Sequence, residues 1–94
     1  MKIKWLQNAL FDLDEVEAYI AKDNPTAAIS TVLKIIDSVG HLSEQSGIGR
    51  AGRVPGTREL IIHSAPFIVP YRVKDGEVQI LRVYHKSRKW PQLF

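Results

Sequence analysis

Side chains that could bind an anion are concentrated in the second half of this 94-residue chain. Between positions 50 and 90 there are nine Lys and Arg residues against three acids, a formal charge of +6, whereas the first 49 residues carry four lysines against seven acids, or −3. Such an asymmetry between the two halves indicates an anionic partner, either a nucleic acid or an acidic polypeptide.

The densest group of cations lies near the C-terminus beside an aromatic side chain: His85, Lys86, Arg88, Lys89 and Trp90. Such a group could stack on a nucleotide base or pack against a protein partner. Residues 86–94 have room for no more than a helical turn or a tail. We expect this cluster to bind a target rather than form a solvated tail, because Trp followed by Pro is a costly composition for a tail.

Three more arginines, Arg58, Arg72 and Arg82, fall one on each of three expected strands. They could extend the same target-binding surface, although arginines on strands more often belong to a salt-bridged or open sheet face. The register that decides between these readings is not fixed by the sequence. Arg50 and Arg53 lie in the loop before these strands.

His63 and His85 both end expected strands, and could act as the general acid and base of a nuclease that uses no metal. Scattered histidines more often have no chemical role, and no HxxxH or HxH spacing supports a metal site. His41 is expected to pack at the apolar end of a helix. Glu59 could be a base, but an ion pair with a neighbouring cation such as Arg58 is favoured.

Several classes of site and location are excluded by composition. Cysteine is absent, so the chain has no disulfide, no thiol nucleophile and no thiolate metal site. The glycines after position 46 lack the strand-before, helix-after context of a phosphate-binding loop. We expect no metal and no cofactor. No window approaches the roughly 20 apolar residues of a membrane span, and the N-terminus lacks a signal-peptide core, so we expect a cytoplasmic protein without a membrane partner.

The first half of the chain should form a strand and a helical hairpin. Residues 2–6 alternate as a strand does, and apolar residues at 10, 13, 16 and 20 predict a helix that ends near Lys22, with acids enriched in its early turns. Asn24 as a cap and Pro25 as a first helical residue predict a second helix over about 25–44. We expect its buried face to be broad and to contain Ala28, Ile29, Val32, Leu33, Ile35, Ile36, Val39 and Leu42.

The second half should form a sheet. Glycines at 47, 49, 52 and 56 predict a flexible loop of about twelve residues, followed by strands at 58–63, 67–73 and 78–84. Pro70 places the middle strand at an edge or beside a bulge, and Asp75-Gly76 predicts a tight hairpin turn. The length and the lack of cysteine indicate one domain, residues 1–94, of the α+β class.

The motifs now resemble those of a known family. The pattern DNPxAA at 23–28, followed by VPGTRELIIH, YRV and ILRVYHKSRKWP, resembles the RelE/ParE superfamily of small toxins from bacterial type II toxin–antitoxin modules. The resemblance covers nearly the whole chain. It implies a β-α-α-β-β-β fold with a helical hairpin against an antiparallel sheet, and an antitoxin partner whose C-terminal segment wraps the toxin.

Two activities occur in this superfamily. RelE-like members cut messenger RNA on the ribosome with the help of an arginine in the middle strand, whose position Ile68 occupies here, and of a C-terminal helix that is reduced here to a stub. The strand FIVPYRV and the short basic tail resemble the ParE branch, which implies inhibition of DNA gyrase, growth arrest and plasmid stabilisation. The target-binding residues would then be Arg58, Arg72, Arg82, His85, Lys86, Arg88, Lys89 and Trp90.

Two alternatives stay open. One is a ribosome-dependent endoribonuclease, whose catalytic candidates would be Arg58, His63, Arg72, His85 and Arg88. The other is a degenerate family member that binds a partner without toxicity. The chain is not expected to be an enzyme unless it is the endoribonuclease.

Overall fold

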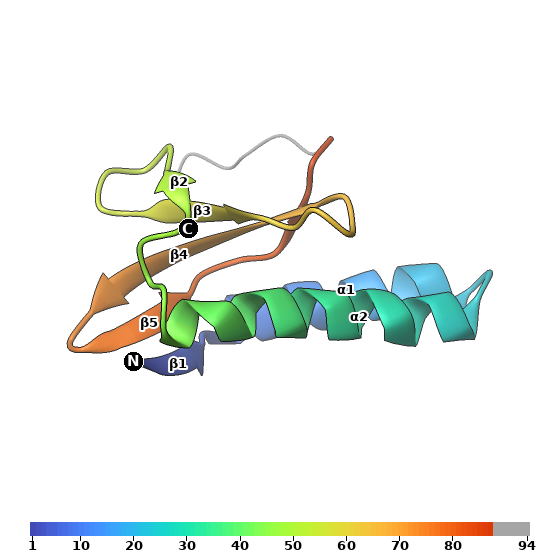
Figure 1. Ribbon diagram of the computed structural model, residues 1–94. Helices are drawn as coiled ribbons and strands as arrows, with labels where there is room; N and C mark the ends of the chain where they lie inside the picture. The colour runs from blue at the N-terminus through green and yellow to red at the C-terminus, as the bar shows by residue number, and fades with distance from the viewer. Residues whose placement is uncertain (88–94) are drawn as a thin grey trace.

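The computed structural model describes residues 1–87, in which two helices lie against one face of a six-stranded sheet (Figure 1). The elements are β1 (Lys2–Trp5), α1 (Gln7–Ala21), α2 (Pro25–Gly40), the 3-10 turn η1 (His41–Ser43), β2 (Arg50–Ala51), β3 (Arg58–Ile61), β4 (Phe67–Lys74), β5 (Glu77–Ile80) and β6 (Tyr84–His85). The strand order is β1-β5-β4-β3-β2, with β1 parallel to β5 and the other pairs antiparallel. The predicted α+β class and element order are confirmed.

Local sequence signals set the start of α2 and the turn between β4 and β5, as expected. The side chain of Asn24 accepts a hydrogen bond of 3.0 Å from the N–H of Ala27, and Pro25 is the first residue of α2. At the tip of the β4–β5 turn, Asp75 and Gly76 have φ angles of 54° and 72°, which is the left-handed backbone that this turn requires.

The buried face of the hairpin is narrower than predicted. On α2, Ala28, Ile35 and Val39 are buried, but Ile29 and Leu33 are 59% and 58% exposed. One neighbouring helix and one sheet cover only part of the circumference of α2, so residues on its outer side stay in solvent. The expectation for His41 was also wrong, because its side chain is exposed and lies 4.0 Å from Asp37.

On α1 the residues that face the core are also different from those expected. Ala9 is completely buried, whereas Leu10 is 48% exposed. The acids predicted for the early turns lie beyond the first turn of α1, and one of them, Asp12, is buried as well. A small side chain at position 9 lets the helix approach the sheet closely, and the next turn of the same face then carries Asp12 inward.

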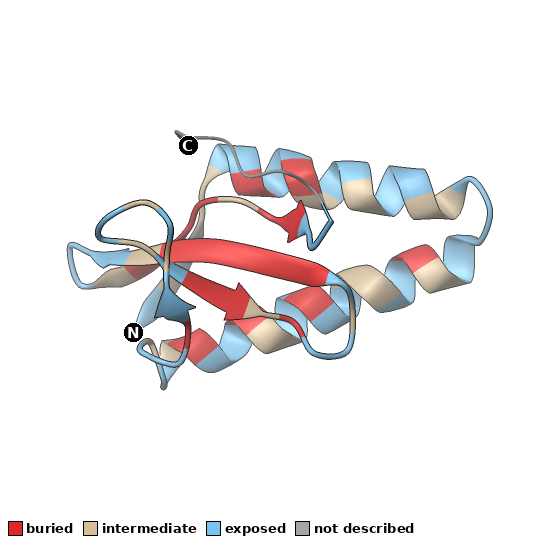
Figure 2. Cartoon of the chain, turned by 90° about the horizontal axis from the view of Figure 1, so that it is seen from above, coloured by how far each residue is buried: buried red, intermediate tan, exposed pale blue. Residues whose placement is uncertain are grey.

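The central strand β4 forms a buried band across the sheet (Figure 2). Phe67, Val69 and Tyr71 belong to the core shared with the helices. Because successive side chains alternate between faces, Ile68, Pro70 and Arg72, with Lys74 beyond them, point to the opposite face of the sheet. We call this surface the far face.

Pro70 produces a bulge in the neighbouring strand. Tyr71 pairs with Ile80 and Ile68 pairs with Tyr84, so two residues of β4 face residues 81–83. The carbonyl of Pro70 accepts a hydrogen bond of 2.9 Å from the N–H of Leu81. The ring nitrogen of Pro70 carries no hydrogen, so it cannot donate a second hydrogen bond to the neighbouring strand. The strand predicted at 78–84 is therefore divided into β5 and β6. Of the two readings of Pro70, the bulge is right and the edge is wrong.

Candidate functional site

The bulge turns its side chains and backbone toward α1. Asp12 accepts hydrogen bonds from Arg82 Nε and Nη2 at 2.7 and 3.0 Å, and a third from the backbone N–H of Val83 at 2.9 Å. The guanidinium of Arg82 also lies 5.0 Å from the ring centre of Tyr84. The hydrogen bond to Asp12 raises the pKa of Arg82 further above its usual value, against the opposing effect of burial. Arg82 therefore stays positively charged where α1 packs against the sheet.

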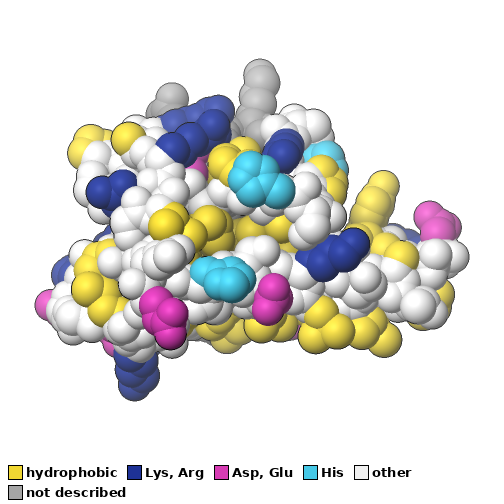
Figure 3. All heavy atoms as spheres, in the orientation of Figure 1, with side chains coloured by type: hydrophobic (Ala, Val, Ile, Leu, Met, Phe, Trp, Pro, Cys, Tyr) yellow, Lys and Arg dark blue, Asp and Glu magenta, His cyan; other side chains and the backbone are white. Residues whose placement is uncertain are grey.

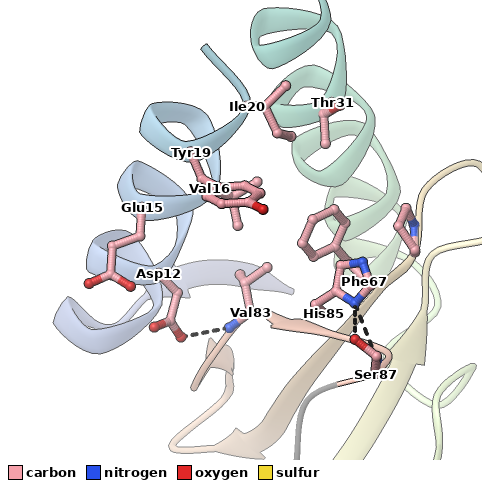
Figure 4. Close-up of a pocket in the computed structure, with 11 residues that line it drawn as sticks. Asp12, Glu15, Val16, Tyr19, Ile20, Thr31, Phe67, Val83, His85 and Ser87 are labelled. Atoms are coloured by element: carbon pink, nitrogen blue, oxygen red, sulfur yellow. Dashed lines mark hydrogen bonds between the residues drawn. The ribbon is translucent and has the colours of Figure 1, made fainter. Parts of the chain in front are cut away.

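A cavity of about 650 Å³ lies beside the contact between Asp12 and Arg82 (Figure 4). It is enclosed by the two helices on one side and by the start of β4 and the strand β6 on the other. Both its helix side and its sheet side combine apolar and polar side chains. Its walls are formed by Asp12, Glu15, Val16, Tyr19, Ile20, Thr31, Pro66, Phe67, Val83, His85 and Ser87.

His85 is held at the mouth of the cavity. Its ring packs edge-on against Phe67, with the ring centres 5.4 Å apart. Its Nδ1 accepts the backbone N–H of Ser87 at 3.2 Å and lies 2.8 Å from the Ser87 hydroxyl. Since Nδ1 is an acceptor in this arrangement, the neutral ring carries its hydrogen on Nε2. His85 could therefore donate through Nε2.

The structure does not join the two histidines that could have formed an acid–base pair. His63 follows β3, on one side of β4, while His85 belongs to β6, on the other side. No hydrogen bond links their rings within residues 1–87. Both side chains are exposed.

The loop before β3 is fixed to the sheet rather than flexible. Tyr71 donates its hydroxyl hydrogen to the carbonyl of Ser46 at 2.8 Å, and the same oxygen accepts the N–H of Gly49 at 2.9 Å. Arg58 Nη1 donates to the carbonyls of Gly47 and Gly49 at 3.3 and 3.0 Å. These contacts let residues 50 and 51 pair with β3 as the short edge strand β2.

Glu59 holds the same loop from the far face. Its carboxylate is 2% exposed and accepts hydrogen bonds from Arg50 Nε at 2.9 Å and from the backbone N–H of Arg53 at 3.2 Å. Arg50 Nη2 lies 2.8 Å from the same carboxylate. Glu59 is thus an ion-pair partner, of Arg50 rather than of its neighbour Arg58.

The middle of the far face is uncharged near β6 and polar toward the β4–β5 turn. Ile68 is 6% exposed and is paired with Ile61 on one side and Tyr84 on the other. Four residues further toward the turn, Arg72 Nε donates to the Gln79 side chain at 2.7 Å, and Gln79 donates to Glu77 at 3.0 Å.

Three of the predicted target-binding residues, Arg88, Lys89 and Trp90, lie outside the described residues. Lys86 is exposed, and its backbone N–H donates to Pro66. The described residues contain no group of three side chains suited to hold a metal ion. Within residues 1–87 no helix is long and apolar enough to cross a membrane.

With the fold and these side chains placed, the chain can be compared with known proteins. The family model described as the ParE toxin of the type II toxin–antitoxin system parDE matches residues 3–90. The chain belongs to the ParE toxin family. This confirms the resemblance to the RelE/ParE superfamily drawn from the sequence motifs.

Individual ParE-family relatives carry names from both branches of the superfamily. The protein named putative toxin Y4kP, from Sinorhizobium fredii, is 45% identical over 98% of this chain and 95% of its own length. Toxin RelE2 of Caulobacter vibrioides is 32% identical over 93% of this chain and 97% of its own length. A solved structure titled as the chromosomal ParDE toxin–antitoxin system from P. aeruginosa has a TM-score of 0.83 and 38% identity, and covers 90% of this chain and 95% of that one.

Proposed function

We propose that this ParE-family toxin arrests growth by inhibiting DNA gyrase in the cytoplasm, and that a cognate antitoxin neutralises it. The observation that carries the choice of gyrase is the apolar surroundings of Ile68. In the RelE-like nucleases this position is expected to hold an arginine. Here Ile68 is buried between Ile61 and Tyr84, so the row of three side chains across the sheet has no charge.

A ribonuclease needs groups that this part of the far face lacks. Cleavage of a phosphodiester requires a cation near the phosphate in the transition state, and an acid and a base within reach of the reacting oxygens. Glu59 faces the same side but is bonded to Arg50, and Arg72 lies four residues from Ile68, toward the β4–β5 turn. His63 and His85 lie on opposite sides of β4. These positions favour a toxin that works by binding.

A ribosome-dependent endoribonuclease remains the second candidate, because of His85. Its Nδ1 is occupied by Ser87 and its Nε2 hydrogen is available as a donor, next to the exposed Lys86. A single histidine with a nearby cation could act as a general acid in RNA cleavage.

The antitoxin partner is supported by the family and by the charge distribution. The P. aeruginosa structure is titled as a ParDE system, so a toxin of this fold is found together with its antitoxin there. The +6 charge over positions 50–90 suits an acidic antitoxin segment, which would be attracted over a distance before it docks.

Purified protein provides the test. Gyrase supercoiling of relaxed plasmid should decline with added toxin, and addition of the antitoxin encoded beside it should restore the reaction. A translating extract programmed with a reporter messenger serves as the parallel assay. Ribosome-dependent cuts in that messenger, with supercoiling unaffected at the same toxin concentration, would replace gyrase with the ribosome as the target.

A further inference from the structure

The far face carries a group of cations at the end that is remote from Ile68. Arg50, Arg53, Arg72 and Lys74 come from β2, the following loop and β4, and we call them the far-face cations. Figure 3 shows Lys and Arg side chains gathered over β2 and its loop, whereas acidic side chains lie lower, along the helices. Of this group only Arg72 was among the target-binding residues predicted from the sequence motifs.

The positions of Arg50 and Arg72 follow from the strand register. Arg50 pairs with Glu59, and Glu59 pairs with Pro70, so all three side chains are directed to one face. Arg72 lies two residues beyond Pro70 on the same face. Since neighbouring strands are about 4.8 Å apart, Arg50 and Arg72 stand roughly 10 Å apart across the strands.

The segment that carries Arg50 and Arg53 is held in place before any ligand arrives. The buried carboxylate of Glu59 bonds both the side chain of Arg50 and the backbone of Arg53. Tyr71 and Arg58 fix the preceding segment from the opposite face. Gly49 completes the arrangement, because a Cβ there would lie 2.6 Å from the ring of Tyr71. A segment fixed in this way loses little conformational entropy on binding.

The chemistry of the face selects the class of partner. Its two acids are already engaged, Glu59 with Arg50 and Glu77 with Gln79. The large apolar side chains exposed in the described residues belong to the N-terminus, the helices, the segment before β2 and the opposite face of β4. A protein partner is usually held by buried apolar anchors, whereas a nucleic-acid backbone is held by spaced cations alone.

We propose that the far-face cations bind the phosphodiester backbone of a nucleic acid. These guanidinium and ammonium groups contact successive phosphates, Arg50 only through the N–H groups that are not bonded to Glu59. The array positions the toxin on the strand without reading its sequence. The inference does not depend on whether gyrase or the ribosome is the target, because both act on nucleic acid.

The experiment measures binding of the full chain to fluorescent duplex DNA of random sequence and to single-stranded RNA, by anisotropy at several salt concentrations. The test variant combines Arg53→Gln with Arg72→Gln, which leaves the Arg50–Glu59 pair intact. Its matched control combines Lys22→Gln with Lys34→Gln, the same loss of charge on the exposed surface of the hairpin region. Thermal unfolding of both variants confirms that they fold.

The test variant should bind at least 10-fold more weakly, and the slope of log affinity against log salt should fall by about 1.8 on DNA or about 1.4 on RNA. The control should retain most of the affinity. The tighter of the two ligands identifies the natural strand. Tyr71→Phe removes the hydroxyl that fixes the loop without changing charge, and should weaken binding several-fold.

Three results would overturn the proposal. An equal loss in the test and control variants would mean that net charge alone causes binding. Unchanged affinity in the test variant would place the nucleic-acid contact elsewhere. Binding of an oligoglutamate peptide with higher affinity than either nucleic acid, lost in the same test variant, would assign the face to an acidic protein segment.

Discussion

Asp12 on α1 binds Arg82, seventy residues further along the chain, through two hydrogen bonds, and uses one of the same oxygens to accept the N–H of Val83. One carboxylate therefore satisfies both the charge and the backbone donor that the bulge opposite Pro70 leaves without a strand partner. This contact joins the helical hairpin to the strand that carries His85.

Replacing Asp12 with Ala should lower the free energy of unfolding by about 3 kcal/mol, because it leaves a partly buried guanidinium and a buried N–H without their acceptor. Urea unfolding provides the measurement. Asp14→Ala is the control, since Asp14 is exposed on the same helix and should change stability by less than about 0.5 kcal/mol. Equal effects of the two substitutions would mean that the Asp12–Arg82 pair does not stabilise the fold.

Tyr71 should make the protein sensitive to alkali. Burial raises the pKa of Tyr71 above its ordinary value of 10.0, although the bond from Gly49 and the charge of Arg58 act in the opposite direction. A raised native pKa means that the stability contribution is complete below pH 10 and is lost as the pH rises from 10 through the native value. Unfolding measured on both sides of pH 10 should show this loss in the parent chain and a smaller one in Tyr71→Phe.

Tyr19→Phe is the matched control for the alkaline experiment, because it removes the same hydroxyl from a tyrosine that is 76% exposed. If Tyr71→Phe loses stability with pH as steeply as the parent does, the buried hydroxyl is not the titrating group.

The fixed loop should respond differently to alanine at its different glycines. A Cβ on Gly52 would lie 2.1 Å from the Thr57 hydroxyl and 2.8 Å from its carbonyl oxygen, whereas a Cβ on Gly47 would meet nothing within 4 Å. Gly52→Ala should therefore destabilise the protein by roughly 1–3 kcal/mol and Gly47→Ala should be close to neutral, as judged from thermal unfolding. Equal melting temperatures would indicate that the loop moves freely.

How far the sequence predicts this structure depends on the range of the interaction involved. The Asn24 cap and the Asp75-Gly76 turn were predictable, because each depends on interactions among no more than four consecutive residues. The pairing of Asp12 with Arg82 was not, since no local pattern distinguishes Asp12 from the other acids of α1. The outward position of Leu10 and Ile29 depends on how much of each helix its neighbours cover, which periodicity alone does not determine.

Among the candidate site residues, local reasoning placed Arg58 and Arg72 on the correct strands but not on their faces. It placed Arg82 on a strand, whereas Arg82 lies in the bulge between β5 and β6. The two readings of Pro70 could be separated only once β4 was known to be central. The loop at 47–56 was expected to be flexible from its glycines, whereas two of those glycines allow the close contacts with Tyr71 and Thr57 that hold it.

The basic tail stays a prediction. We expect Arg88→Ala with Lys89→Ala to reduce growth arrest on induction while the melting temperature is kept, because charged residues after the last strand contribute to binding rather than to the core. Full toxicity of this double variant would remove the tail from the mechanism and leave the far-face cations as the principal target-binding group.

The most direct test of the proposed function is to count covalent gyrase–DNA complexes and new messenger ends in the same induced cells. If the toxin inhibits gyrase, trapped complexes should rise within the first minutes, and messenger ends should match those of uninduced cells. New messenger ends that depend on His85, with no increase in trapped gyrase, would contradict the account and identify the protein as a ribonuclease.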